Sequence, residues 1–113
     1  MIYDKAHELV RDIKVSPEYG ELKVAREKLE KNSESQKVLQ DYQVKRLELQ
    51  TMQMQGIEIT AEKRQEYEKI TELIRLHPTV SEYLEAEYKM AKIMDDIQRI
   101  IIDGLEIKQF EKE

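Results

Sequence analysis

The sequence predicts an all-α fold, an elongated antiparallel helical bundle of four main helices plus one short helix. Of its 113 residues, 38% are charged and 40% are hydrophobic, whereas only three are Gly and two are Pro. A charged composition with few helix breakers is typical of long helices and coiled coils. Apolar residues also recur at helical spacing. The chain length indicates one domain with a modest core, which we place at residues 1–107, followed by a charged tail at residues 108–113.

The first helix is expected from Ile2 to Val15. Its apolar residues follow the three-to-four spacing of one helix face, and they are Ile2, Ala6, Leu9, Val10 and Ile13. We assign this face to the core of the chain. A charge introduced at Leu9, or at Ile74 in a later helix, is therefore expected to unfold the protein.

The second helix, the short one, is expected to begin at Ser16-Pro17-Glu18 and to run to about Lys31. Ser can cap the first turn, Pro has the φ angle of a first helical residue, and Glu is favourable near the positive end of the helix dipole. The inward positions are Tyr19, Leu22, Ala25 and Leu29. Gly20 lies inside this pattern, which predicts a kink or a close contact there.

The third helix is expected over residues 34–55. Asn32 can end the preceding helix in the left-handed conformation, and Ser33-Glu34-Ser35-Gln36 has the pattern of a capping box. The helix is expected to stop at Gly56, because glycine tolerates the positive φ that a helix end commonly needs.

Thr60 is predicted to cap the fourth helix, which runs from Ala61 to about Leu76. Pro78 ends it, because proline disfavours helical geometry at the preceding residue. Thr79-Val80-Ser81-Glu82 is a second capping-box candidate and would begin a final helix that reaches about Ile107, with Gly104 as a weak interruption.

Two of these helices are too long for a compact globule. At 1.5 Å per residue, residues 34–55 would span about 33 Å and residues 79–107 about 43 Å. A compact domain of this length has a radius of gyration of about 13 Å. The helices must therefore project from the core or lie along a partner, and we expect an elongated molecule.

The last helix carries more apolar residues than one neighbour can cover. One stripe comprises Met90, Ile93, Ile97 and Ile100, and an adjacent stripe comprises Val80, Leu84, Ala91, Met94, Ile101 and Leu105. Together they exceed the narrow seam of a helix pair. We therefore predict a homo-oligomer, with a dimer favoured, and a further protein partner is compatible with the same surface. The alternative is a single-chain bundle whose own helices surround the last helix.

The candidate oligomer or partner interface consists of seven residues, namely Tyr83, Tyr88, Met90, Ile93, Ile97, Ile100 and Ile101. The two tyrosines are included because an apolar ring with a polar tip suits a half-buried interface position. A charge at Ile97 or Ile100 should dissociate the oligomer if this interpretation is correct, because an unpaired buried charge is costly.

Composition argues against several other kinds of partner. The net charge is −5 and no Lys/Arg block stands out, so we expect no direct binding to nucleic acid. The longest apolar run is Ile100 to Ile102, which argues against membrane insertion. The chain has no cysteine, and the opening MIYDKAHELVRD lacks the basic and apolar regions of a signal peptide. We therefore expect a cytoplasmic protein without disulfides or thiolate metal sites.

No catalytic or cofactor-binding residues are predicted. Asp4 and His7 have the i, i+3 spacing of helical-bundle metal ligands, but a di-metal bundle needs two such units. The only other histidine is His77, where a ring near the end of a helix has an ordinary structural role. The sequence has no Gly-rich phosphate loop and no nucleophile–base signature. We expect no metal and no enzymatic activity, and an enzyme is the third hypothesis after a binding protein and a regulatory subunit.

Five short segments, taken in order, resemble the YlbF/YmcA family of small helical bacterial proteins, most closely its YheA-like branch. The segments are Ile2-Tyr3-Asp4 with Ala6 and Leu9, Ser16-Pro17-Glu18-Tyr19, Met52-Gln53-Met54-Gln55-Gly56, Tyr83-Leu84-Glu85-Ala86-Glu87 and Ile97-Gln98-Arg99-Ile100-Ile101. The resemblance covers residues 2 to about 107.

The resemblance implies a helical protein with a regulatory, protein-binding role. Members of the family are linked to competence, sporulation and biofilm formation, and some belong to a complex that modulates RNA processing by RNase Y. The members of that complex are associated with iron–sulfur clusters and carry cysteines, whereas this chain has none and cannot supply thiolate ligands. We therefore expect a non-enzymatic interaction or adaptor protein. A regulatory subunit of an RNase Y accessory complex is the alternative.

Overall fold

The computed structural model describes residues 1–107 and confirms the all-α prediction. In the described part of the chain the elements are α1 (Ile2–Lys14), α2 (Pro17–Glu30), α3 (Ser33–Met54), α4 (Ala61–Arg75) and α5 (Pro78–Gly104). The predicted charged tail, residues 108–113, lies outside the described residues. The shortest helix is α1 with 13 residues, whereas α2, expected to be the short one, has 14.

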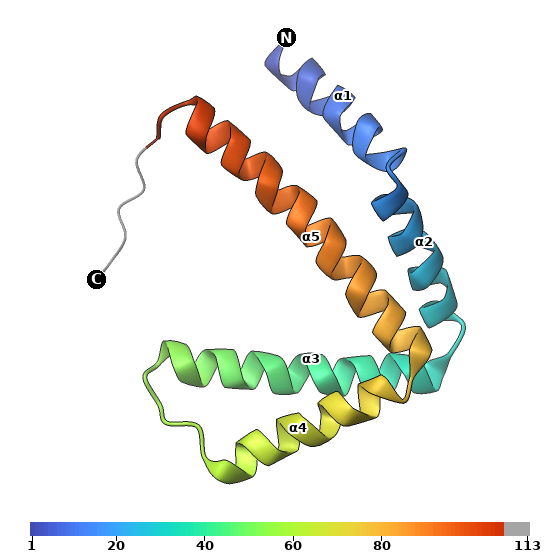
Figure 1. Ribbon diagram of the computed structural model, residues 1–113, viewed down its shortest axis with the longest axis vertical. Coiled ribbons are helices and arrows are strands. Elements are labelled where there is room, and N and C mark those ends of the chain that lie inside the picture. The colour runs from blue at the N-terminus through green and yellow to red at the C-terminus, as the bar shows by residue number, and fades with distance from the viewer. Residues whose placement is uncertain (108–113) are drawn as a thin grey trace.

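The helices form two arms that meet at an elbow (Figure 1). One arm is the antiparallel pair of α2 and α5, with α1 beyond the start of α2, and the other is the α3–α4 hairpin. The molecule measures 51 × 43 × 16 Å, and its radius of gyration is 18.0 Å. A compact chain of this length would have a radius of about 13 Å, so the predicted elongation is confirmed. The 16 Å thickness is little more than one helix with its side chains, about 10–12 Å.

The elbow contains the main core. Leu29 from α2, Val38 and Leu39 from α3, Ile74 from α4 and Val80 from α5 form one buried cluster. Val80 is fully buried. Half-buried side chains close the cluster at its edges, and these are Tyr42, Tyr83 and Leu84. Four helices therefore depend on one small group of aliphatic side chains.

A second cluster joins α2 to the first half of α5. Leu22 and Ala25 of α2 pack against Ala86 of α5, and the small alanine side chains let the two helices lie close together. Ion pairs cross the same contact on either side of the cluster. Lys28 lies 3.6 Å from Glu82, and Lys89 lies 3.2 Å from Glu21. The buried residues of α2 are the predicted Leu22, Ala25 and Leu29, which confirms its inward face.

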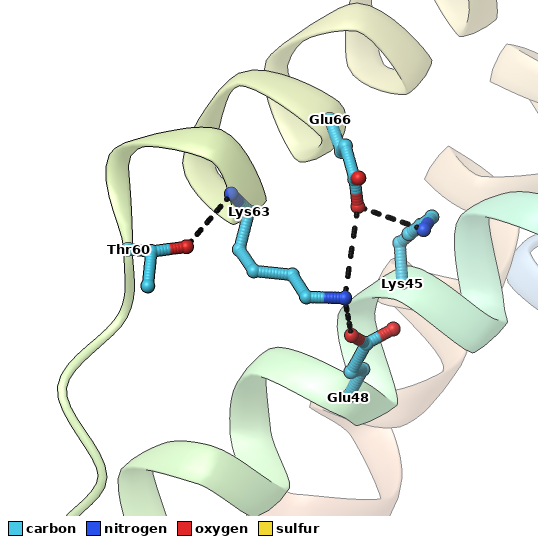
Figure 2. A network of polar contacts seen from close by, with 5 residues as sticks. All are labelled: Lys45, Glu48, Thr60, Lys63 and Glu66. Carbon is cyan, nitrogen blue, oxygen red and sulfur yellow. Dashed lines mark hydrogen bonds and ion pairs between the residues drawn. The ribbon is translucent and has the colours of Figure 1, made fainter.

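Polar contacts hold α4 against α3 towards the tip of the hairpin (Figure 2). Lys45 of α3 donates a 2.9 Å hydrogen bond to Glu66 of α4. Lys63 of α4 pairs with Glu48 of α3 and lies 3.9 Å from Glu66. The bond from Lys45 holds the pKa of the Glu66 carboxyl below its ordinary value, and the bond to Glu48 raises the pKa of Lys63. All of these groups reach solvent, so their pairing contributes little to stability.

Several predicted helix ends are confirmed. The Ser16 hydroxyl accepts a 3.3 Å hydrogen bond from the Tyr19 backbone N–H and donates a 2.6 Å bond to the Ile13 carbonyl, so one side chain links α1 to α2. The Thr60 hydroxyl accepts from the Lys63 N–H and caps α4. Gly56 follows α3 with a φ of +70°. Two hydroxyl caps and one glycine with a positive φ therefore set these three boundaries.

Three predicted capping patterns are wrong. Asn32 has a φ of −129° and caps the start of α3 by accepting a hydrogen bond from Ser35, so it does not end α2 in the left-handed conformation. The capping box predicted at residues 33–36 is wrong for the same reason, because Ser33 is already the first residue of the helix. The Gln36 amide instead donates to the carbonyls of Leu29 and Glu30, which completes the end of α2. The capping box expected at residues 79–82 is also absent, because α5 already begins at Pro78 with His77 as its N-cap.

Three further expectations are corrected. No heavy atom lies within 4 Å of a Cβ built at Gly20, so the close contact expected there is wrong, and α2 is one continuous helix. The last helix ends at Gly104 and does not reach Ile107. Leu9 is 38% exposed, and α1 has no buried residue, so the apolar face of α1 is not part of the core. A charge at Leu9 is therefore not expected to unfold the chain.

Two leucines of α3 provide a matched test of the elbow. Leu39 is 7% exposed within the core, whereas Leu47 is 63% exposed on the same helix. Leu39→Ala should lower the free energy of unfolding by about 2–5 kcal/mol, because it leaves a cavity in the cluster. Leu47→Ala should change it by no more than about 0.5 kcal/mol. Denaturant unfolding at one protein concentration measures both, and equal losses would contradict the assigned core.

The contact between Lys45 and Glu66 can be tested by titration. Because the pKa of Glu66 is lowered in the folded chain, its contribution to stability is present above the unfolded pKa and is lost as the pH falls through the folded pKa. Lys45→Met should move the NMR titration midpoint of Glu66 upward. Lys37→Met, on the same helix, should leave that midpoint where it is, and an equal shift in both variants would argue against a specific pair.

Candidate interaction surface

The far part of α5 extends beyond the chain's own core. The last α5 side chain that packs against either core cluster is Met90. We call residues 91–104 the distal segment of α5. Its isoleucines are unevenly covered, because Ile93, Ile97 and Ile102 are half-buried whereas Ile100 is 70% exposed and Ile101 is 51% exposed. The apolar face of α5 therefore continues beyond the side chains that pack in the core clusters.

The structure divides the seven candidate interface residues into two groups. Tyr83 packs against both core clusters, and Met90 packs against the cluster shared by α2 and α5. Burial, followed by a hydrogen bond with Glu87, raises the pKa of Tyr83. These two side chains therefore already have partners within the chain.

The remaining five candidates are Tyr88, Ile93, Ile97, Ile100 and Ile101. Tyr88 is 72% exposed, on a different side of α5 from Tyr83. The structure brings Ile93, Ile97, Ile100 and Ile101 together along one broad apolar band of the distal segment, because residues at these spacings share neighbouring rows of a helix. Their assignment to an interface with another chain remains a prediction.

The interface prediction omitted α1, which also has an uncovered apolar face. Ile2 and Val10 are exposed and Leu9 is partly exposed, although all three lie on the same stripe. Within residues 1–107, α2 is the only helix that contacts α1. The signal that could have revealed this is the helix start at Ser16 and Pro17, which separates the stripe of α1 from the buried stripe of α2.

The residues considered for chemistry do not come together. Asp4 pairs with the N-terminal amine of Met1 at 3.3 Å, and His7 lies on the exposed surface of α1. Across residues 1–107, no three His, Asp or Glu side chains gather in a way that could hold a metal ion. No helix within that range combines the length and the apolar character needed to cross a bilayer.

Comparison with known proteins identifies the family. A family model described as control of competence regulator ComK, YlbF/YmcA, matches residues 2–106. The chain belongs to the YlbF/YmcA family. The family is thus associated with regulation of competence, and its description indicates no catalytic activity.

Bacterial relatives match along nearly their whole length. A UPF0342 protein of Halothermothrix orenii is 41% identical over 112 residues, which is 99% of this chain and 95% of the relative. A UPF0342 protein of Alkalihalophilus pseudofirmus is also 41% identical, over 93% of this chain and 89% of the relative. A solved structure of a protein of unknown function (DUF964) from Bacillus stearothermophilus superposes with a TM-score of 0.77 at 21% identity. It covers 93% of this chain and 92% of its own, which shows a shared fold.

Substitution of the two tyrosines separates a core role from an interface role. Tyr83→Ala should lower the free energy of unfolding by about 2–3 kcal/mol, somewhat less than for a fully buried aromatic ring. Tyr88→Ala should change it by less than about 0.5 kcal/mol, because its ring is exposed. Thermal or denaturant unfolding followed by circular dichroism measures both, and a larger loss for Tyr88 would contradict the placement of the two rings.

Proposed function

We propose that this protein is a non-enzymatic interaction protein of a bacterial regulatory system and that it self-associates through the distal segment of α5. The observation that carries the proposal is the band of Ile93, Ile97, Ile100 and Ile101, which continues past Met90, the last α5 side chain that packs against a core cluster. A contiguous apolar surface that is only partly covered is typical of an interaction site.

The shape of the molecule supports the same proposal. The core is small and lies at the elbow, so the arms provide surface rather than enclosed volume. Enzyme sites usually bring polar groups together in a deep concave pocket. Here the chemistry-bearing side chains Asp4 and His7 lie on an exposed helix, and the apolar side chains dominate the far end of α5.

The family supports a regulatory setting. Its description refers to the control of the competence regulator ComK. A rigid elbow that presents apolar helices suits this role, because helix faces can pack against other helices without further folding. Self-association through α5 would place two such elbows in one particle.

Charges introduced on the distal segment test the proposal. Ile97→Glu and Ile100→Glu should each shift the light-scattering mass at micromolar concentration toward that of one chain, because a buried unpaired charge costs several kcal/mol. Most of the helical circular dichroism should remain, since neither residue belongs to a core cluster. Leu47→Glu is the matched control on the exposed surface of the other arm and should leave the mass unchanged. A monomeric wild type, or dissociation only by Leu47→Glu, would contradict the proposal.

A further inference from the structure

The helix α1 has an apolar face that the chain itself does not cover. The face consists of Ile2, Ala6, Leu9, Val10 and Ile13. None of these residues is buried, and within residues 1–107 α1 contacts only α2. An isolated helix of 13 residues is marginal in water even with favourable residues. The stripe on α1 therefore requires a covering surface from outside the described chain.

The distal segment of α5 is the matching surface on the same arm. Both α1 and residues 91–104 extend past the contact of α2 with α5 towards the same end of the molecule, where they run in roughly antiparallel directions without touching (Figure 1). Their lengths agree, because the 13 residues of α1 span about 20 Å and the 14 residues of the distal segment about 21 Å. One copy thus presents two uncovered apolar helices of equal length.

We propose that α1 of one copy packs against the distal segment of α5 in a second copy, parallel to it, and that a two-fold axis repeats the contact. The same axis places the two distal segments side by side and antiparallel. This inference rests on the proposed self-association and adds the segment that completes it. The occupant of the band on α5 is then a second copy of this chain.

Charge complementarity favours this pairing and its direction. At 100° per residue, His7 and Lys14 lie along one edge of the apolar stripe of α1, and Asp96 and Asp103 lie along one edge of the band on α5. Both pairs are seven residues apart, so a parallel contact brings His7 to Asp96 and Lys14 to Asp103 in one register.

The opposite direction is less favourable. An antiparallel contact would place both Lys5 and Asp12 of α1 along the edge of Asp96 and Asp103, so that one attractive pair is offset by a repulsive one. Among residues 1–107, neither Lys14 nor Asp103 takes part in an ion pair, whereas Asp96 pairs with Lys92 one turn away at 3.2 Å. Parallel docking therefore supplies partners for groups that the described chain leaves exposed.

The buried area also favours inclusion of α1. A helix face about 20 Å long and 10 Å wide covers roughly 200 Å² when counted as a flat strip. A contact between two distal segments alone buries one such strip per copy, whereas a standard stable interface buries about 800 Å² per partner. In the reciprocal arrangement α5 contributes two strips and α1 contributes one, which raises the flat area to roughly 600 Å² per copy. The band on α5 is broad enough to contact two helices of the second copy, namely its distal segment and its α1.

Cross-linking of full-length chains tests the proposal, because the native chain has no cysteine. Lys14→Cys and Asp103→Cys chains are mixed in equal amounts under reducing conditions and treated with a short bismaleimide. Each chain carries one thiol, so every product joins two copies. The product that joins position 14 of one chain to position 103 of another should clearly exceed half of all cross-linked product, which is the share expected from random pairing. The reason is that the two-fold arrangement keeps the two copies of position 14 apart, and likewise the two copies of position 103.

Two matched mixtures serve as controls, one for the helix faces that are in contact and one for the parallel direction of the contact. Arg11→Cys with Arg99→Cys places the thiols away from both apolar stripes and should give no excess over random pairing. Lys14→Cys with Ala91→Cys reports antiparallel docking and should give less product than Lys14→Cys with Asp103→Cys. An excess of the Ala91 product, or random pairing in the Lys14 and Asp103 mixture, overturns the inference.

Light scattering on the same mixtures tests self-association separately from the contact that α1 makes. A dimeric mass without preferential Lys14–Asp103 linkage overturns the role of α1 and leaves self-association through α5 intact. A monomeric mass overturns both the proposed function and the role of α1. A dimeric mass with the preferential linkage supports both.

Discussion

Val80 lies where four helices meet, and the rest of the structure depends on this contact. It is fully buried among Leu29, Leu39 and Ile74, which come from α2, α3 and α4. One small cluster therefore fixes the angle between the two arms. A chain of 113 residues has little apolar surface to spare for a second large core. The arms are therefore one layer thick, and their ends extend past the core clusters.

This distribution of the core explains where an interaction surface can exist. Helices that leave the elbow keep their amphipathic pattern, although their neighbours diverge or end. In α5 the pattern continues from Ala86, which is buried, to Ile100, which is exposed. In α1 the whole stripe lies outside the core. Since an exposed apolar stripe is unfavourable in water, association of two copies would stabilise both the assembly and the helicity of the two exposed segments.

Much of the fold could be predicted from the sequence, because its signals are local. Ser16, Thr60 and Gly56 each act within one turn of a helix, and the spacing of Leu22, Ala25 and Leu29 identifies the inward face of α2. Where two local signals compete, prediction fails. The proline at position 78 begins α5 before the Thr79 pattern can cap it, and Asn32 caps α3 from the position expected to end α2.

The candidate surface was harder to predict, because periodicity shows that a helix has an apolar face but does not show what covers it. Leu9 has the same spacing signal as Leu22, yet only Leu22 is buried. Tyr83 and Tyr88 lie five positions apart, which places them about 140° apart around α5, so they do not share a face. The first difference depends on which helices pack against α1 and α2, and this is set by the tertiary arrangement of the helices.

Hydrogen exchange at several protein concentrations tests most directly whether a second copy covers the exposed helices. Amide protection in residues 2–14 and 91–104 should increase as the concentration rises through the dissociation range, while residues 36–42 at the elbow stay equally protected throughout. Exchange in α1 that is fast at every concentration, or protection of α1 and the distal segment that does not depend on concentration, would contradict the account.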